Sequence, residues 1–110
     1  GEIGKAVNVV LERYGISMDA VAVVASADVK AQEEGLFDFV EKYRKELRFF
    51  TAEQLNAVPV PNPSKHAMEH LGIHSVSEAS ALLGAGEGGT LLAEKTVFDA
   101  VTVALAKMRE

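Results

Sequence analysis

The amino-acid sequence predicts an α/β fold of three layers, with a mixed β-sheet between helices on both faces. The first observation is the segment 20–27, AVAVVASA, an unbroken run of small and β-branched residues that is typical of a strand covered on both faces. The second is that segments with a helical spacing of apolar residues stand on either side of this run. The third is the alternation of Val101, Val103 and Leu105, which predicts a closing strand with one apolar face.

Composition restricts the class of protein further. A chain of 110 residues is expected to form a single domain over residues 1–110, and a hydrophobic share of 48% excludes a disordered chain. The absence of Cys excludes disulfides, a thiol nucleophile and a thiolate metal site. A net charge of −5 argues against a nucleic-acid partner. No run is long enough for a membrane span and no secretory signal is visible, so we expect a cytoplasmic protein.

The N-terminal half alternates helices and strands. Residues 2–14 carry apolar residues at helical spacing, and Gly15 is expected to end this helix. The apolar strand 20–27 follows. A second helix is predicted over residues 33–46 from its stripe of apolar side chains, and residues 47–50 then form a short strand.

Three short helices and a pair of strands are predicted for the C-terminal half. Residues 51–54 and 75–78 both fit the capping box, in which a Ser or Thr hydroxyl and a Gln or Glu side chain cap the start of a helix reciprocally. Between them, Asn62 and Pro63 are expected to open a helix that Gly72 ends. The closing strands are expected to be antiparallel and to cover residues 90–93 and 98–106.

The loop that leaves the strand 20–27 is the first candidate site. In open α/β sheets ligands bind at the carboxyl ends of the strands, and Ser26, Asp28 and Lys30 follow this end directly. Ser26 and Asp28 are able to donate and accept hydrogen bonds there, and Lys30 to hold an anionic group. An ordinary turn with a solvated lysine explains the same residues equally well.

A second candidate loop covers residues 60–65. Asn62, Ser64 and Lys65 stand at a predicted helix start, where free backbone N–H groups favour a carboxylate or a phosphate. A well-capped helix without a ligand is the commoner explanation. His66 and His70 lie one turn apart, but a metal site needs further ligands, so no metal is expected.

Two further patterns are weighed and set aside. Gly84, Gly86 and Gly89 satisfy the spacing of a dinucleotide-binding loop, but they follow a predicted helix and precede a strand, which is the wrong context. No cofactor is therefore expected. Asp28, Glu53 and Glu78 are the carboxylates nearest the candidate loops, and each is a candidate for a general base, although capping explains Glu78 without any chemistry.

Read in order, segments spread over nearly the whole sequence resemble the C-terminal domain of the CbiG/CobE family of cobalamin (vitamin B12) biosynthesis proteins. The most specific are the strand with its Ser-x-Asp-x-Lys loop, the Arg-Phe-Phe piece and the Pro-Asn-Pro-Ser piece. The segments that carry the resemblance are residues 23–30, 33–36, 47–55, 60–64, 75–82, 88–92 with Lys95, and 101–106.

The resemblance implies a protein that acts on the contracting tetrapyrrole ring. Within this family, the sequence is similar to the cobalt-precorrin-5A hydrolases, which open a δ-lactone and release acetaldehyde. The substrate is then an anionic tetrapyrrole, whose carboxylates Lys30, Lys65, Lys95 and the helix start at Asn62 would receive. Asp28 or Glu53 would activate water, and Lys30 would stabilise the oxyanion.

Family members begin with a strand and a loop containing glycine, cysteine and arginine ahead of the first helix. This sequence begins inside that helix, so we expect a domain without the first strand and loop. Full hydrolases also carry other domains, and a companion domain or pathway enzyme is an expected partner. A non-catalytic module that binds or docks the intermediate remains the alternative, and a metal-binding domain based on His66 and His70 is a weaker third.

Overall fold

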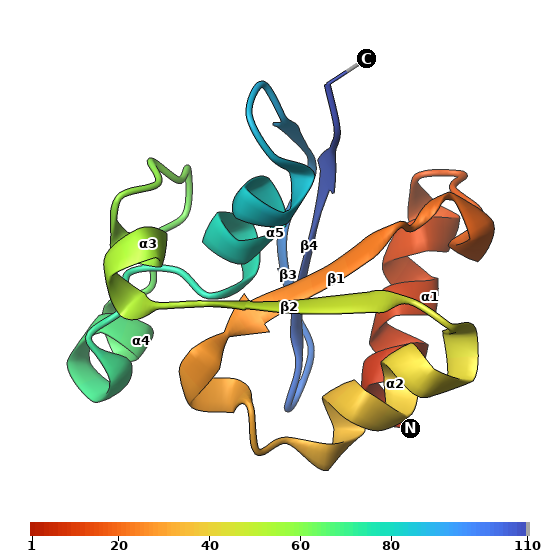
Figure 1. Cartoon of the computed structure of the whole chain (residues 1–110), viewed down its shortest axis with the longest axis horizontal. Coiled ribbons are helices and arrows are strands. Elements are labelled where there is room, and N and C mark those ends of the chain that lie inside the picture. The colour runs from red at the N-terminus through yellow and green to blue at the C-terminus, as the bar shows by residue number, and fades with distance from the viewer. Residues whose placement is uncertain (110) are drawn as a thin grey trace.

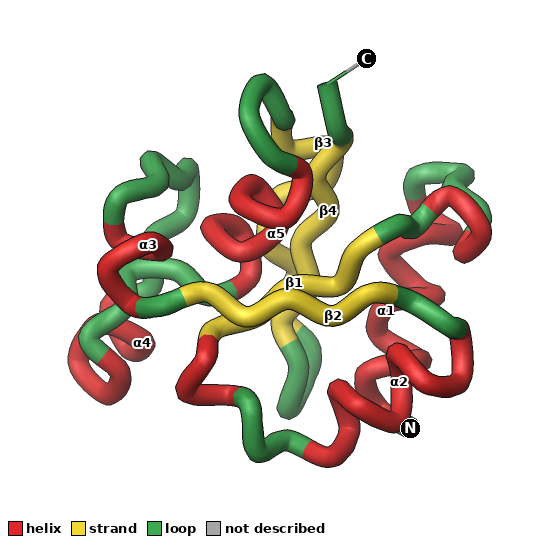
Figure 2. Tube along the Cα trace, in the orientation of Figure 1, coloured by secondary structure: helices red, strands yellow, loops and turns green. Residues whose placement is uncertain are grey.

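The computed structural model describes residues 1–109 as nine helices and strands with two short 3₁₀ turns (Figures 1 and 2). The elements are α1 Glu2–Arg13, η1 Met18–Ala20, β1 Val23–Ala27, η2 Asp28–Lys30, α2 Glu34–Tyr43, β2 Glu46–Phe50, α3 Ala52–Asn56, α4 Lys65–Leu71, α5 Ser77–Ala85, β3 Thr90–Val97 and β4 Thr102–Lys107. No helix within residues 1–109 has the length and apolar run required to cross a membrane.

Local sequence explains the first helices. In α1 the buried residues Ala6, Val10 and Leu11 recur at helical spacing. Gly15, which follows the helix, adopts a φ of 63°, a backbone conformation that residues with a side chain rarely adopt. The predicted capping box at α3 is confirmed. The Thr51 hydroxyl accepts the Gln54 N–H at 3.1 Å, while Gln54 Oε1 accepts the Thr51 N–H at 2.9 Å.

The α/β class is confirmed, and both parallel and antiparallel pairing occur. β1 pairs with β2 in parallel, with Val23 opposite Glu46 and Ala27 opposite Phe50. β3 pairs with β4 in antiparallel fashion, with register shifts along β3. The prediction of one mixed sheet is wrong for residues 1–109, which form two separate two-stranded sheets. The run 20–27 was interpreted as a central strand, but β1 has a neighbouring strand on one side only and faces a cavity on the other.

Helix α5 packs against both sheets. It packs against β1 and against β4, so that it lies between the two strand pairs in Figure 1. On the opposite side of the molecule from α3 and α4, α1 packs against α2 and β4. Two buried clusters result, one from α1 and the β3–β4 sheet (Ala6, Val10, Ala93, Val103) and one around α3 and α5 (Ala27, Leu55, Ile73, Ala79).

Two predicted helix starts require correction. The helix expected to open at Asn62 and Pro63 begins at Lys65, because Ser64 is its N-cap and accepts the Ala67 N–H at 3.0 Å, whereas the Asn62 side chain bonds elsewhere. The capping box expected at residues 75–78 does not form. Ser75 does accept the Ala79 N–H at 3.2 Å, but the Glu78 carboxylate bonds to distant parts of the chain.

The strand ends also differ from the expectation. β1 begins at Val23 rather than Ala20, because residues 18–20 form the turn η1, which Ser17 caps by accepting the Asp19 N–H. β3 extends to Val97, four residues beyond its predicted end, and β4 begins at Thr102. The Phe98 N–H donates to the Val101 carbonyl at 2.7 Å and closes the turn between them.

Candidate functional site

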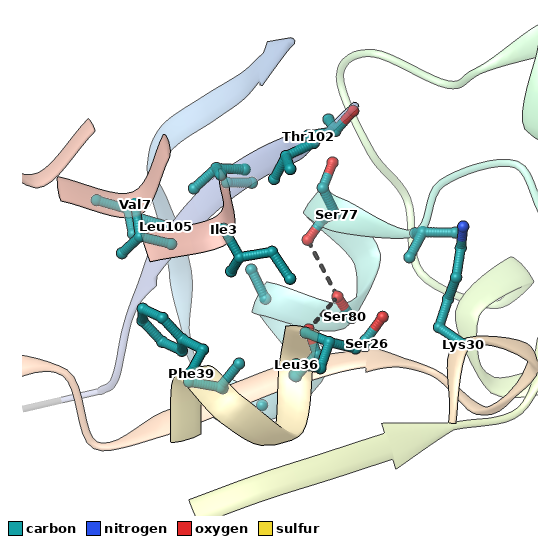
Figure 3. Close-up of a pocket in the computed structure, with 18 of the residues that line it drawn as sticks. Ile3, Val7, Ser26, Lys30, Leu36, Phe39, Ser77, Ser80, Thr102 and Leu105 are labelled. Atoms are coloured by element: carbon teal, nitrogen blue, oxygen red, sulfur yellow. Dashed lines mark hydrogen bonds between the residues drawn. The ribbon is translucent and has the colours of Figure 1, made fainter. Parts of the chain in front are cut away.

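A cavity of about 1530 Å³ lies between the two strand pairs and the helices α1, α2 and α5. Figure 3 shows that its walls differ from one end to the other. Apolar side chains gather on one side, and polar side chains gather on the other, where β1 ends. The apolar side chains labelled there are Ile3, Val7, Leu36, Phe39 and Leu105, and the polar ones are Ser26, Lys30, Ser77, Ser80 and Thr102.

Five of the residues predicted to bind substrate line this one cavity. They come from four different parts of the chain: the end of β1, the turn η2, the loop before α4, and β3. Lys30 and Lys95 are half-buried, and Ser26 is buried. The five are Ser26, Lys30, Asn62, Ser64 and Lys95.

The other three predicted site residues lie outside the cavity lining. Asp28 is exposed in the turn η2, two residues before Lys30. Glu53 is exposed in the first turn of α3, and Lys65 is exposed at the start of α4. Neither candidate general base therefore contacts the cavity.

A buried carboxylate, Glu78, does not line the cavity itself but holds two residues that do, Asn62 and Lys95. Its side chain is 0% exposed and accepts three hydrogen bonds. The Asn62 N–H donates to Oε1 at 3.1 Å, Asn62 Nδ2 donates to Oε2 at 2.8 Å, and the Lys95 N–H donates to Oε2 at 2.9 Å. These bonds compensate the cost of burying the charge. Glu78 thus ties the loop before α4 and strand β3 to the start of α5.

The same contacts define what Asn62 does. Its Nδ2 atom donates to Glu94 Oε1 at 2.8 Å as well as to Glu78. Both amide hydrogens and the backbone N–H of Asn62 are therefore engaged within the protein. Asn62 holds the loop in place and has no donor left for a ligand in this arrangement.

Lys30 ends the turn η2, which directly follows β1. Its Nζ forms an ion pair with Glu33 Oε1 at 3.3 Å, and the two side chains are 38% and 47% exposed. An ion pair this exposed contributes little, about 0–1 kcal/mol, because water screens it. A ligand carboxylate is able to displace Glu33 at small cost.

Hydroxyl groups complete the polar end. Ser80 Oγ donates to the Ala25 carbonyl at 3.2 Å, which fixes α5 against β1 (Figure 3). Ser77 and Thr102 line the cavity nearby. Sequence reasoning did not identify Ser77 and Ser80 as site residues. It considered Glu78 as a general base and set it aside as a helix cap, because the sequence did not reveal its distant partners Asn62 and Lys95.

The two histidine rings of α4 contact each other in a tilted arrangement, with centroids 4.2 Å apart and an interplanar angle of 46°. Within residues 1–109 no group of three or more His, Cys, Asp or Glu side chains is arranged to hold a metal ion. The pair His66 and His70 thus has no third ligand from the described part of the chain.

Comparison with known proteins places the chain in a family. Residues 1–106 match the family model described as cobalamin synthesis G C-terminus, so the chain belongs to this family. It is 30% identical over 105 residues to the cobalt-precorrin-5A hydrolase of Priestia megaterium, covering 96% of this chain and 28% of that protein. It is 32% identical over 94 residues to the protein CobE of a Sinorhizobium species, covering 84% of this chain and 61% of that protein.

The fold agrees with this assignment. The crystal structure of CobE, a protein from the cobalamin biosynthetic pathway, superposes with a TM-score of 0.90 at 28% identity. The match covers 97% of this chain and 80% of that one. The chain thus spans about a quarter of the hydrolase and three-fifths of the CobE sequence that it matches. The predicted family resemblance is confirmed.

Proposed function

We propose that this chain is the C-terminal domain of a cobalt-precorrin-5A hydrolase and that it binds an anionic tetrapyrrole intermediate at the polar end of the cavity. The observation that carries the proposal is the convergence of Lys30, Lys95, Ser26 and Ser77 on one wide cavity with apolar walls. A tetrapyrrole has an apolar macrocycle and peripheral carboxylates. Half-buried lysines and serine hydroxyls suit the carboxylates, and the apolar walls suit the ring.

The test of binding is an absorbance titration with cobyrinic acid, a cobalt corrinoid that retains its carboxylates. Lys30→Ala and Lys95→Ala are each expected to weaken binding roughly three- to tenfold, because each removes one charge-assisted contact that is partly exposed. Lys5→Ala on the exposed face of α1 is the matched control and is expected to bind like the unaltered chain. Equal affinity for all four proteins would exclude this end of the cavity as the site.

Hydrolysis is a separate part of the proposal. In the δ-lactone reaction, Asp28 or Glu53 would take a proton from the attacking water and Lys30 would stabilise the oxyanion. Asp28 is better placed because it shares the turn η2 with Lys30. Asp28→Asn is expected to lower turnover of the lactone at least about a hundredfold, with corrinoid binding retained. Glu53→Gln is the comparison, and full turnover by both variants would remove the catalytic assignment.

One observation favours a binding or docking module instead. None of the carboxylates Asp28, Glu53 and Glu78 lines the cavity, and the buried Glu78 already accepts three hydrogen bonds. Under this alternative the corrinoid binds, but no carboxylate variant alters turnover, since a companion domain or pathway enzyme supplies the catalytic groups. Turnover measured with and without that companion domain separates the two functions. A cytoplasmic location belongs to the same proposal and is tested by cell fractionation.

A further inference from the structure

One face of helix α4 lines the cavity. Both histidines of the helix belong to this face, and an alanine and a leucine stand beside them. Together these residues span less than half of the helix circumference, so they lie on one side of α4. The Ser64 N–H donates to the His74 carbonyl at 2.6 Å, which joins the segments before and after the helix. The α4 residues in the cavity lining are His66, Ala67, His70 and Leu71.

The two imidazoles are available to a ligand. His66 and His70 are exposed, and their rings contact each other with centroids 4.2 Å apart. Within residues 1–109 neither ring forms a hydrogen bond or an ion pair. His74 differs, because its ring is half-buried and its Nε2 lies 3.1 Å from the Leu55 carbonyl oxygen. The cavity wall therefore carries ring nitrogens that the described chain does not use.

A pair of histidines is too few ligands for a free metal ion but is enough for a metal held in a macrocycle. Within residues 1–109 no third His, Cys, Asp or Glu completes a metal site. In a metallated tetrapyrrole the ring nitrogens fill the equatorial positions. The protein then supplies only an axial ligand, as a histidine does for haem iron. Imidazole is the commonest metal ligand that proteins provide, so one ring of the pair suffices.

We propose that one imidazole of the pair His66 and His70 is an axial ligand to the cobalt ion of the bound tetrapyrrole. The inference rests on the proposed function, because the cobalt arrives with the substrate. The imidazole nitrogen displaces an axial water, and the oxidation state of the cobalt does not change. Lys30 and Lys95 receive carboxylates at the edge of the macrocycle, whereas the imidazole approaches its face. This contact distinguishes a cobalt-loaded tetrapyrrole from a metal-free one.

The experiment combines the full 110-residue chain with cobyrinic acid in its cobalt(II) form, at a concentration that saturates the absorbance change. The unpaired electron of this ion lies along the axial direction, so an axial nitrogen splits each cobalt line of the EPR spectrum into a triplet. Axial water produces no such splitting. We expect the triplet with the unaltered chain, and a doublet when its histidines carry nitrogen-15.

The variants identify the ligand. The triplet is expected to be lost in the double variant His66→Ala and His70→Ala, and the two single variants show which ring ligates. His74→Gln is the matched control and should retain the triplet, since it removes a histidine whose ring is already engaged. Both substituted positions of the double variant are exposed, so its fold should be retained, which circular dichroism checks.

A metal-free corrinoid with the same carboxylates supplies a second measurement. The unaltered chain is expected to bind it at least about tenfold more weakly than the cobalt form, because the axial contact is lost. The double variant should bind the two forms equally. Equal affinity of the unaltered chain for both forms would contradict the inference.

The failure of this inference is distinguishable from the failure of the proposed function. Saturable binding without nitrogen splitting would overturn the axial ligand and leave the tetrapyrrole site in place. A triplet that survives in the double variant, or that remains a triplet after the histidines are labelled, would assign the axial nitrogen to another group. Absence of any binding would overturn both the ligand and the site.

Discussion

At the scale of single residues, Glu78 positions Asn62 and Lys95, two of the residues that line the cavity. It is wholly buried in the structure, and its three donors come from two residues that lie 16 and 17 positions away in the sequence. Burial of a carboxylate is tolerated because every one of these donors is directed at it. The positions of Asn62 and Lys95 therefore depend on this one acceptor.

Replacing Glu78 by glutamine tests this dependence. The amide nitrogen of Glu78→Gln would face at least one of the three donors, so a buried hydrogen bond is lost and a donor is left unsatisfied. We expect a loss of about 2–3 kcal/mol in the free energy of unfolding, measured by urea denaturation. Glu94→Gln is the control, since Glu94 is exposed and accepts a single bond from Asn62. Equal losses for the two variants would contradict the role given to Glu78.

At the scale of helices and strands, the two predicted capping boxes explain how far sequence reasoning extends. The box at Thr51 formed as predicted because both of its hydrogen bonds join residues three positions apart. The box at Ser75 failed because Glu78 has better partners far away in the sequence, which a local pattern does not reveal. In the same way, the run 20–27 predicted the strand β1, but its central position was wrong, because strand neighbours depend on long-range packing and only Ser26 and Ala27 of β1 are buried.

The Thr51 box supports the shortest helix of the fold. Thr51→Ala is expected to cost about 1 kcal/mol, because the Gln54 N–H at the start of α3 loses its acceptor. Thr51→Ser retains the hydroxyl and should recover most of the loss, which urea denaturation of the three proteins measures. A serine variant as unstable as the alanine variant would indicate that the methyl group of Thr51, not the cap, matters.

At the scale of the whole molecule, the buried clusters lie on different elements and the cavity lies between the two strand pairs. One cluster includes Val10 and Val103, and the other includes Leu55 and Ile73. The candidate site could be predicted only in part, because some of its residues are identified by local sequence and others by long-range packing. Ser26 lies near the end of β1 and Lys30 follows that strand, so both were found from the sequence, whereas Lys95 reaches the cavity only because β3 lies beside α5. Lys95 was included through family resemblance and not through its local pattern.

Because the two buried clusters are separate, we expect a substitution in one cluster to destabilise the elements around it more than those around the other. Leu55→Ala is expected to cost about 2–5 kcal/mol and to speed amide exchange in α3 and β1 more than in β3 and β4. Val10→Ala should show the opposite pattern, with faster exchange in α1 and β4. Uniform acceleration in both variants would show that the clusters unfold as one unit.

Helix α5 has a consequence for how the sequence is able to vary. It contacts both sheets, and small residues hold three of its four buried positions: Ala79 and Ser80 are almost wholly buried, and a methyl group added at Gly84 would lie 3.2 Å from the Ala25 Cβ. A larger side chain at Gly84 would press against β1. In a random mutational library, survivors should therefore carry few changes along this face of α5, while the exposed positions of α4 accumulate them freely.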